Sequence, residues 1–126
     1  MSDERPPVAI GHVSLRVGDV EGAVRFYAAL GLRRIMATPG MAILELRGGT
    51  HLLLFRAKGT PRAGRVRSFD FMVDDVDAAR ERLAGEGIPC SPAADDRLSG
   101  HRWFEVTDPD GHVIGVYSSH ADRRPV

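Results

Sequence analysis

Hydrophobic and polar residues alternate along GHVSLRV, residues 11–17, and a similar pattern returns in RSFDFMV, residues 67–73. Alternation with a period of two is typical of a β-strand that buries one face. Each stretch is followed by an aspartate and then by hydrophobic residues at helical spacing, which end at Gly31 in the first copy and at Gly87 in the second. Both copies therefore predict a strand, a short turn and a helix.

The two predicted helices have matching signals at both ends. Asp19 and Asp75 stand where a side chain can accept a hydrogen bond from the first free backbone N–H groups of a helix. Gly31 and Gly87 suit the left-handed conformation that commonly follows the last turn. We therefore expect both aspartates to cap their helices.

The matching segments form an internal repeat. Adding 56 to Val17 or Asp19 gives Val73 or Asp75. Strand-like runs follow each helix, MAILEL and THLLLF in the first copy and RWFEV and HVIGVY in the second. Two stretches, residues 58–64 and 91–100, have the composition of exposed loops. The pattern predicts an α+β fold of two tandem βαβββ modules, about 8–57 and 65–119, in a single domain of residues 1–126 with frayed ends up to about Pro7 and beyond about His120.

Composition excludes several classes of partner. The chain has 17 basic and 17 acidic residues, so no net charge attracts nucleic acid or an anionic membrane surface. No apolar run reaches the roughly 20 residues that a membrane-spanning helix needs, and MSDERPP lacks the apolar core of a signal peptide. A single cysteine, Cys90, cannot form an intrachain disulfide and fits a reducing compartment. We expect a cytoplasmic protein.

Strand alternation sorts the polar residues onto one face of each module. His12, Ser14 and Arg16 share a face that is opposite to the hydrophobic positions of the first strand. The same phase places Ser68, Asp70 and Met72 together in the second copy. Their neighbours Phe69, Phe71 and Val73 are then expected to lie under the second helix. His51 shares a face with Leu53 and Phe55, whereas His112, inside a DPDGH turn, is expected at the surface.

With this repeat and these motifs the chain resembles the vicinal oxygen chelate superfamily, which includes glyoxalases, bleomycin-binding resistance proteins and extradiol dioxygenases. The resemblance rests on HVSLRVGDVEGAVRFYAALGL, FDFMVDDVDAARERLAGEGI and WFEVTDPDGHVIGVY, and it covers about residues 10–118. It implies paired βαβββ modules that form a curved, barrel-like mixed sheet with the helices outside, commonly as a homodimer. It also implies a small-molecule ligand.

Members of this superfamily usually hold a divalent metal with residues at four equivalent places. In this chain the resemblance assigns those places to His12, Leu53, Ser68 and Gly115. Only His12 is a good metal ligand, because Leu53 and Gly115 have no donor atom and a neutral serine hydroxyl is a poor donor. We therefore expect no metal cofactor, with His12 the one retained ligand-type position. The alternative is a displaced metal site that uses His12, His51, Asp70 or Glu105.

Polar and hydrophobic residues on the expected cavity faces predict a binding site for a small molecule. Comparison with the superfamily adds Trp103, Glu105 and Glu45 to these faces. Trp103 is either a stacking surface or a core or dimer contact, and the two glutamates either act chemically or pair with Arg16, Arg47 or Arg102. The predicted ligand-binding residues are Ser14, Arg16, His51, Leu53, Phe55, Ser68, Asp70, Met72, Trp103 and Gly115.

Two other functions remain open from the sequence. The chain could be a glyoxalase-like lyase or isomerase, or a dioxygenase-related enzyme, with Glu105 or Glu45 as a base next to a carbonyl and His12 orienting the oxygen. Arg16 is then the cation that would stabilise the developing negative charge. The residual possibility is a non-catalytic dimeric interaction module.

Overall fold

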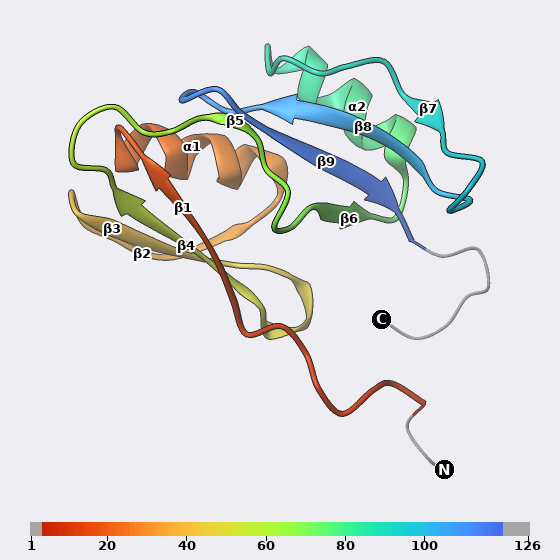
Figure 1. The fold of residues 1–126 in the computed structure, drawn as a ribbon, viewed down its shortest axis with the longest axis horizontal. Helices are drawn as coiled ribbons and strands as arrows, with labels where there is room; N and C mark the ends of the chain where they lie inside the picture. The colour runs from red at the N-terminus through yellow and green to blue at the C-terminus, as the bar shows by residue number, and fades with distance from the viewer. Residues whose placement is uncertain (1–3, 120–126) are drawn as a thin grey trace. The chain divides into compact units, whose positions relative to one another are not determined.

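The fold is described from a computed structural model, which places residues 4–119; the outermost parts of the predicted frayed ends lie outside this range. The predicted α+β fold is confirmed, with two sheets and two α-helices in the described chain. The chain divides into two compact units (Figure 1). We call Pro6–Arg62 the first module and the chain from Ala63 onward the second module.

The first module contains a four-stranded mixed sheet with the order β1-β4-β3-β2. β1 runs parallel to β4, whereas β3 is antiparallel to both β4 and β2. A turn of 3-10 helix precedes β4. The elements are β1 (His12–Val17), α1 (Val20–Leu30), β2 (Arg33–Ala37), β3 (Met41–Glu45), the 3-10 helix (Arg47–Gly49) and β4 (His51–Arg56).

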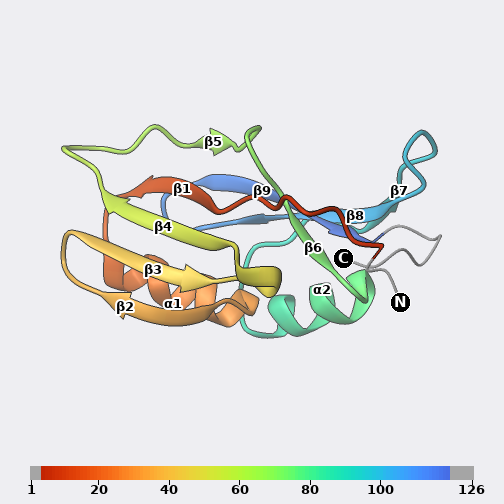
Figure 2. The same ribbon diagram turned by 90° about the horizontal axis from the view of Figure 1, so that it is seen from below.

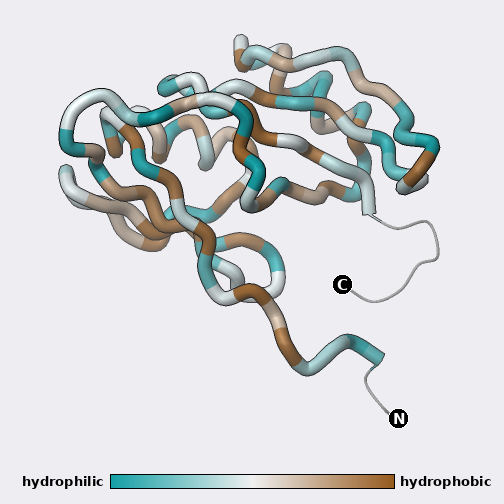
Figure 3. Tube along the Cα trace, in the orientation of Figure 1, coloured by the Kyte–Doolittle hydropathy of each residue, from teal (hydrophilic) through white to brown (hydrophobic). Residues whose placement is uncertain are grey.

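The helix α1 covers one face of this sheet (Figure 2). The predicted alternation in β1 is confirmed, because Leu15 and Val17 are buried and His12, Ser14 and Arg16 are exposed. Bands of hydrophobic and hydrophilic colour mark this alternation along the chain in Figure 3. The fully buried residues of the other strands are Ala42, Leu44, Leu52 and Leu54, and α1 adds Tyr27.

The second module repeats this plan with shorter edges. β8 and β9 form its central antiparallel pair, β7 pairs with β8, and β5 and β6 both pair with β9 in parallel. Phe104 and Val106 of β8 are fully buried. The elements are β5 (Gly64–Arg65), β6 (Phe71–Val73), α2 (Val76–Gly85), β7 (Ala94–Asp95), β8 (Arg102–Thr107) and β9 (His112–Ser118).

The strand predicted at residues 67–73 is interrupted in the structure. Only Phe71–Val73 is extended and paired, and the prediction was wrong for residues 67–70. Arg65 pairs with Val113 and Phe71 with Val116, so five residues, 66–70, lie opposite only two residues of β9, 114 and 115. The excess length cannot stay in the ladder and leaves the sheet. The loops predicted at 58–64 and 91–100 accordingly include the start of β5 and all of β7.

Both helices end as predicted, but they begin differently. Gly31 and Gly87 have positive φ angles of 127° and 82°. The Asp75 carboxylate accepts a hydrogen bond from the backbone N–H of Ala78 at 3.0 Å, whereas Asp19 makes no such side-chain bond. The prediction of an aspartate cap is therefore confirmed for α2 and wrong for α1. Neither described helix has the length and apolar character required to cross a membrane.

This difference predicts unequal effects of two matched substitutions. Asp75→Ala is expected to lower the free energy of unfolding by about 0.5–2 kcal/mol, because it leaves an N–H group of α2 without its partner. Asp19→Ala, at the equivalent position of the repeat, is expected to cost less. Urea unfolding of both variants measures the difference, and equal losses would contradict the observed cap geometry.

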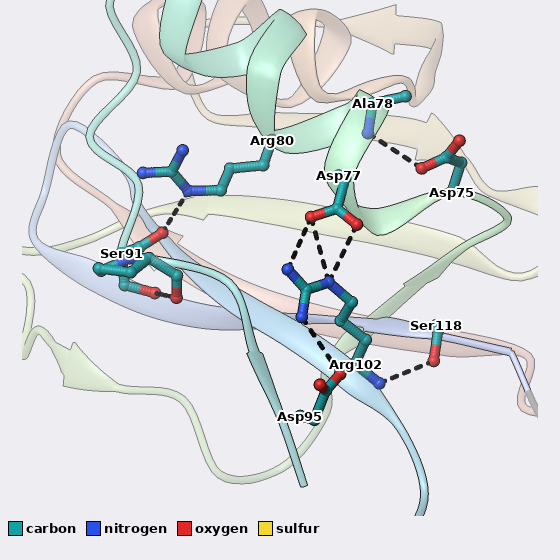
Figure 4. Close-up of polar contacts among 9 residues, drawn as sticks. Asp75, Asp77, Ala78, Arg80, Ser91, Asp95, Arg102 and Ser118 are labelled. Carbon is teal, nitrogen blue, oxygen red and sulfur yellow. Dashed lines mark hydrogen bonds and ion pairs between the residues drawn. The ribbon is translucent and has the colours of Figure 1, made fainter.

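Arg102 connects three elements of the second module (Figure 4). Its guanidinium donates to both carboxylate oxygens of Asp77 in α2 at 2.9–3.1 Å and to Asp95 in β7 at 3.2 Å. These hydrogen bonds lower the pKa of the Asp77 carboxyl below its usual value. Arg80 of α2 donates in addition to the backbone oxygen of Ser91 at 2.6 Å. α2 and the short edge strand are thus held by polar contacts as well as by the core.

Candidate functional site

The interrupted strand of the second module borders a pocket. The pocket has a volume of about 280 Å³ and lies where residues 66–70 leave the sheet, over the exposed face of β8 and β9. Its size is near the lower end of the range typical of small-molecule sites. The lining residues are Arg65, Val66, Arg67, Phe69, Asp70, Trp103, Glu105, Gly115 and Tyr117.

Two aromatic side chains form one wall of the pocket. Trp103 and Tyr117 are directly paired across β8 and β9, and their rings are stacked with centroids 5.5 Å apart and an interplanar angle of 9°. His101 meets Tyr117 edge-on at 5.9 Å and is fixed by a 2.7 Å contact between its Nδ1 and the backbone oxygen of Ser118. The stack gives the pocket a broad aromatic surface, of the kind that binds planar ligands.

Gly115 lies beneath this stack, and its missing side chain makes the arrangement possible. A Cβ atom at Gly115 would lie 2.6 Å from the ring of Tyr117, much closer than van der Waals contact allows. The position of the Tyr117 ring, on the same face of β9, therefore requires glycine at position 115. No larger residue fits at this position unless the Tyr117 ring moves.

The two carboxylates of the pocket, Glu105 and Asp70, differ in their surroundings. Arg65 donates to Glu105 at 2.9 Å, and the Glu105 side chain is only 18% exposed. Burial raises the pKa of the Asp70 carboxyl, and the nearby His101 partly counteracts this increase. Burial also raises the pKa of the Tyr117 phenol, with a further contribution from the negative charge of Asp70. Tyr117 therefore stays a hydrogen-bond donor at neutral pH.

Four of the residues predicted from sequence line this pocket together: Asp70, Trp103, Glu105 and Gly115. Ser68 lies in the bend of the interrupted strand and Met72 is 40% exposed on β6, and neither lines the pocket. Phe69, expected under the second helix, lines the pocket instead, whereas Phe71 is buried as expected. The interruption of the strand reverses the assignment of Phe69.

The remaining predicted residues lie on the face of the first-module sheet opposite to α1. His12 and His51 are direct neighbours on β1 and β4, with ring centroids 5.9 Å apart. Glu45 follows on β3, with its carboxylate 3.9 Å from His51 Nε2, and it pairs with Arg33 on β2. Ser14, Arg16, Leu53 and Phe55 occupy the same face.

The ion pairs differ from those proposed from sequence. Glu45 pairs with Arg33 and Glu105 with Arg65, whereas Arg16, Arg47 or Arg102 had been considered. Arg33 lies on the strand next to Glu45, whereas Arg65 on β5 is separated from Glu105 on β8 by β9. Neither the strand order nor the register could be read from the local sequence. Five lining residues were also missed: Arg65, Val66, Arg67, Phe69 and Tyr117. Tyr117 could have been found, because it is the repeat equivalent of Phe55, 62 positions earlier, which was selected.

Comparison with known sequences identifies the family. Residues 9–116 match the profile of the Glyoxalase/Bleomycin resistance protein/Dioxygenase superfamily. The chain belongs to this superfamily. Among curated proteins, no sequence matches it.

Several solved structures have the same fold as this chain. Lactoylglutathione lyase from Agrobacterium tumefaciens has 25% sequence identity and a TM-score of 0.73, with 90% of this chain and 96% of the lyase covered. A superfamily member from Sphaerobacter thermophilus has 21% identity and a TM-score of 0.74, with 89% and 98% covered. Oxidase ChaP-H1 has 20% identity and a TM-score of 0.73, with 90% and 97% covered.

The residues at the four positions that the resemblance assigns to metal do not fit a metal ion. Gly115 cannot be given a ligand side chain while the Tyr117 ring covers it. Ser68 lies outside the strand that would orient it, and Leu53 offers no donor atom. A single imidazole at His12 is too few ligands to retain a divalent ion.

A different group in the second module could hold a cation. Ligand atoms of Asp108, Asp110 and His112 lie within 4.8 Å of one another. However, one Asp108 carboxylate oxygen already accepts hydrogen bonds from the backbone N–H groups of Asp110 and His112, both at 2.9 Å. His112 is only 5% exposed, so its prediction as a surface residue was wrong. The three residues build the turn between β8 and β9, and this role accounts for their positions.

Proposed function

We propose that this protein binds a small organic molecule in the second-module pocket, without a metal ion at the four superfamily positions. The observation that carries the proposal is the stack of Trp103 and Tyr117 above Gly115. It replaces a possible metal ligand with an aromatic surface inside a pocket. Charged groups of both signs, from Arg65, Glu105 and Asp70, supply the polar contacts that orient a ligand in such a pocket.

Binding is tested by a thermal-shift screen of small aromatic compounds against chelator-treated protein, with hits confirmed by isothermal titration. Trp103→Ala is expected to weaken the binding of a hit by about tenfold, because it removes half of the stacking surface. Leu98→Ala is the control, since Leu98 lies in the same module and is 99% exposed. It should leave the affinity unchanged.

Two outcomes would overturn the proposal. One is that no compound stabilises the protein. The other is that binding requires added zinc, nickel, iron or manganese, which would mean that a metal site forms despite the Tyr117 ring.

A second candidate function is that of an enzyme, a lyase or isomerase, and the similarity to a lactoylglutathione lyase favours it. Glu105 would then remove a proton next to a carbonyl, and the Tyr117 hydroxyl would donate a hydrogen bond to the oxygen. The Arg65–Glu105 ion pair would have to open before Glu105 could act. Turnover of lactoylglutathione, abolished by Glu105→Gln, would establish this function; equal rates in both proteins would exclude it.

We also propose that the two modules act as a single domain within a cytoplasmic homodimer. The lone Cys90 is compatible with a reducing compartment, and the superfamily commonly forms dimers. Sedimentation of the purified protein measures the oligomeric state, and a monomer at micromolar concentration would contradict the proposal.

A further inference from the structure

Asp70 differs from Glu105, the other acidic residue of the pocket, because no arginine pairs with it among the described residues. Glu105 is neutralised by Arg65 at 2.9 Å. Asp70, by contrast, has neither a hydrogen bond nor an ion pair with any of the residues 4–119. The residue as a whole is accessible to solvent, yet the pocket walls desolvate its carboxyl group enough to disfavour the charged form. The charge of His101 offsets this loss of hydration only in part. A carboxylate that is incompletely compensated in this way attracts a positively charged ligand.

The aromatic wall of the pocket favours the same ligand charge. Trp103 and Tyr117 line the pocket together with Asp70. The face of an aromatic ring carries partial negative charge and attracts cations, most strongly in the case of tryptophan. Burial and the negative charge of Asp70 raise the pKa of the Tyr117 phenol, so this ring presents a neutral hydroxyl beside Asp70.

The two arginines of the pocket do not reverse this preference. Arg65 is engaged by Glu105. Arg67 is exposed, so its guanidinium stays hydrated and does not require an anionic ligand. Binding an anion at Arg67 would also leave the desolvated Asp70 uncompensated. The Asp70 carboxylate is therefore the group in the pocket that would gain most from a ligand, and it favours a positively charged one.

We propose that the ligand of this pocket is a small aromatic amine in its protonated form, whose ring lies against Trp103 and whose ammonium group pairs with Asp70. This inference rests on the proposed function and names the chemical class of the ligand. A pocket of about 280 Å³ accommodates a compound of one or two rings.

Three probes that share one ring system test the charge preference. They are 2-naphthylmethylamine, which is protonated at neutral pH, the uncharged 2-naphthylmethanol and the anionic 2-naphthylacetate. Isothermal titration at pH 7.5 and low salt is expected to show that the amine binds about five- to tenfold more tightly than the alcohol. The acetate is expected to bind most weakly.

Asp70→Asn is expected to abolish the preference, so that the amine and the alcohol bind the variant equally. Glu81→Gln removes one negative charge from the exposed surface of α2, outside the pocket lining, and serves as the control for long-range electrostatics. It should keep the preference. Asp70→Asn is also expected to leave the melting temperature unchanged or slightly raised, because the charged form of Asp70 is disfavoured by burial.

The pH dependence gives an independent measurement. Because the pKa of Asp70 is raised, the affinity for the amine is expected to fall as the pH is lowered through that pKa, whereas the affinity for the alcohol stays constant. The other charged or titratable groups that line the pocket or act on Asp70 are His101, Tyr117, Glu105, Arg65 and Arg67. The Asp70→Asn variant identifies the part of the pH dependence that belongs to Asp70.

The outcomes separate this inference from the proposed function. Equal binding of the amine and the alcohol, or tighter binding of the acetate, would overturn the inference. The proposed function would then still hold if Trp103→Ala weakened the binding of the alcohol. Failure of all three probes to bind at millimolar concentration would overturn both.

Discussion

Leu54→Ala is expected to lower the free energy of unfolding by about 2–5 kcal/mol. Leu54 is fully buried in the middle of β4, where it is paired with Leu15 of β1 and with Ala42 of β3. Its side chain lies on the sheet face that packs against α1. Removing three buried carbon atoms loses their transfer free energy and leaves a cavity that three flanking elements cannot close. Urea unfolding followed by tryptophan fluorescence and circular dichroism measures the loss.

Leu53→Ala is the matched control, because it makes the same chemical change one position earlier on the opposite sheet face. Leu53 is partly exposed, so its truncation is expected to cost about 1 kcal/mol or less. The ratio of the two losses in free energy of unfolding shows whether β4 buries Leu54 and exposes Leu53 in solution. Equal losses would mean that β4 does not bury the face shown in the structure.

Gly115→Ala is the second large effect, and it is expected to lower the free energy of unfolding by about 1–3 kcal/mol. The added methyl group would lie 2.6 Å from the Tyr117 ring. Tyr117 can move only by giving up its stack on Trp103, since the two residues are cross-strand neighbours. The substitution should therefore also change the near-ultraviolet circular dichroism of the aromatic pair and weaken ligand binding in the pocket.

A double-mutant cycle isolates the cause of this effect. In a Tyr117→Ala background the methyl group meets no ring, so Gly115→Ala should become nearly neutral. The difference between the two backgrounds measures the steric conflict directly. An unchanged cost of Gly115→Ala without the tyrosine ring would show that the strand backbone, and not Tyr117, requires glycine.

Much of the fold could be predicted because local signals and the repeat agree. The alternation in β1, the glycine stops at Gly31 and Gly87, and the βαβββ order all depend on short stretches of sequence. A repeat doubles each of these signals, because one copy supports the assignment of the other. The superfamily and its expected metal positions followed from the same stretches.

Part of the candidate site was also accessible from sequence. Asp70, Trp103, Glu105 and Gly115 line the pocket and were selected by strand alternation and by comparison between the two copies. Tyr117 was missed although the repeat pointed to it. The partners of the two glutamates were missed because Arg33 lies 12 positions from Glu45 and Arg65 lies 40 positions from Glu105. Such pairs depend on strand register, which short stretches do not contain.

The sequence by itself determined the repeated module and the buried faces of strands such as β1. It also shows poor metal ligands at three of the four positions that the resemblance to the superfamily assigns to metal. Only the tertiary structure decided which side chains surround Gly115, one of these positions. RSFDFMV has the composition and alternation of a strand, yet its first four residues leave the sheet, because five residues must pass opposite two residues of β9. This mismatch between distant segments brings Phe69 into the pocket lining, together with Asp70, Gly115 and the Trp103–Tyr117 stack. It arises from pairing across more than forty residues, so no local pattern could have shown it.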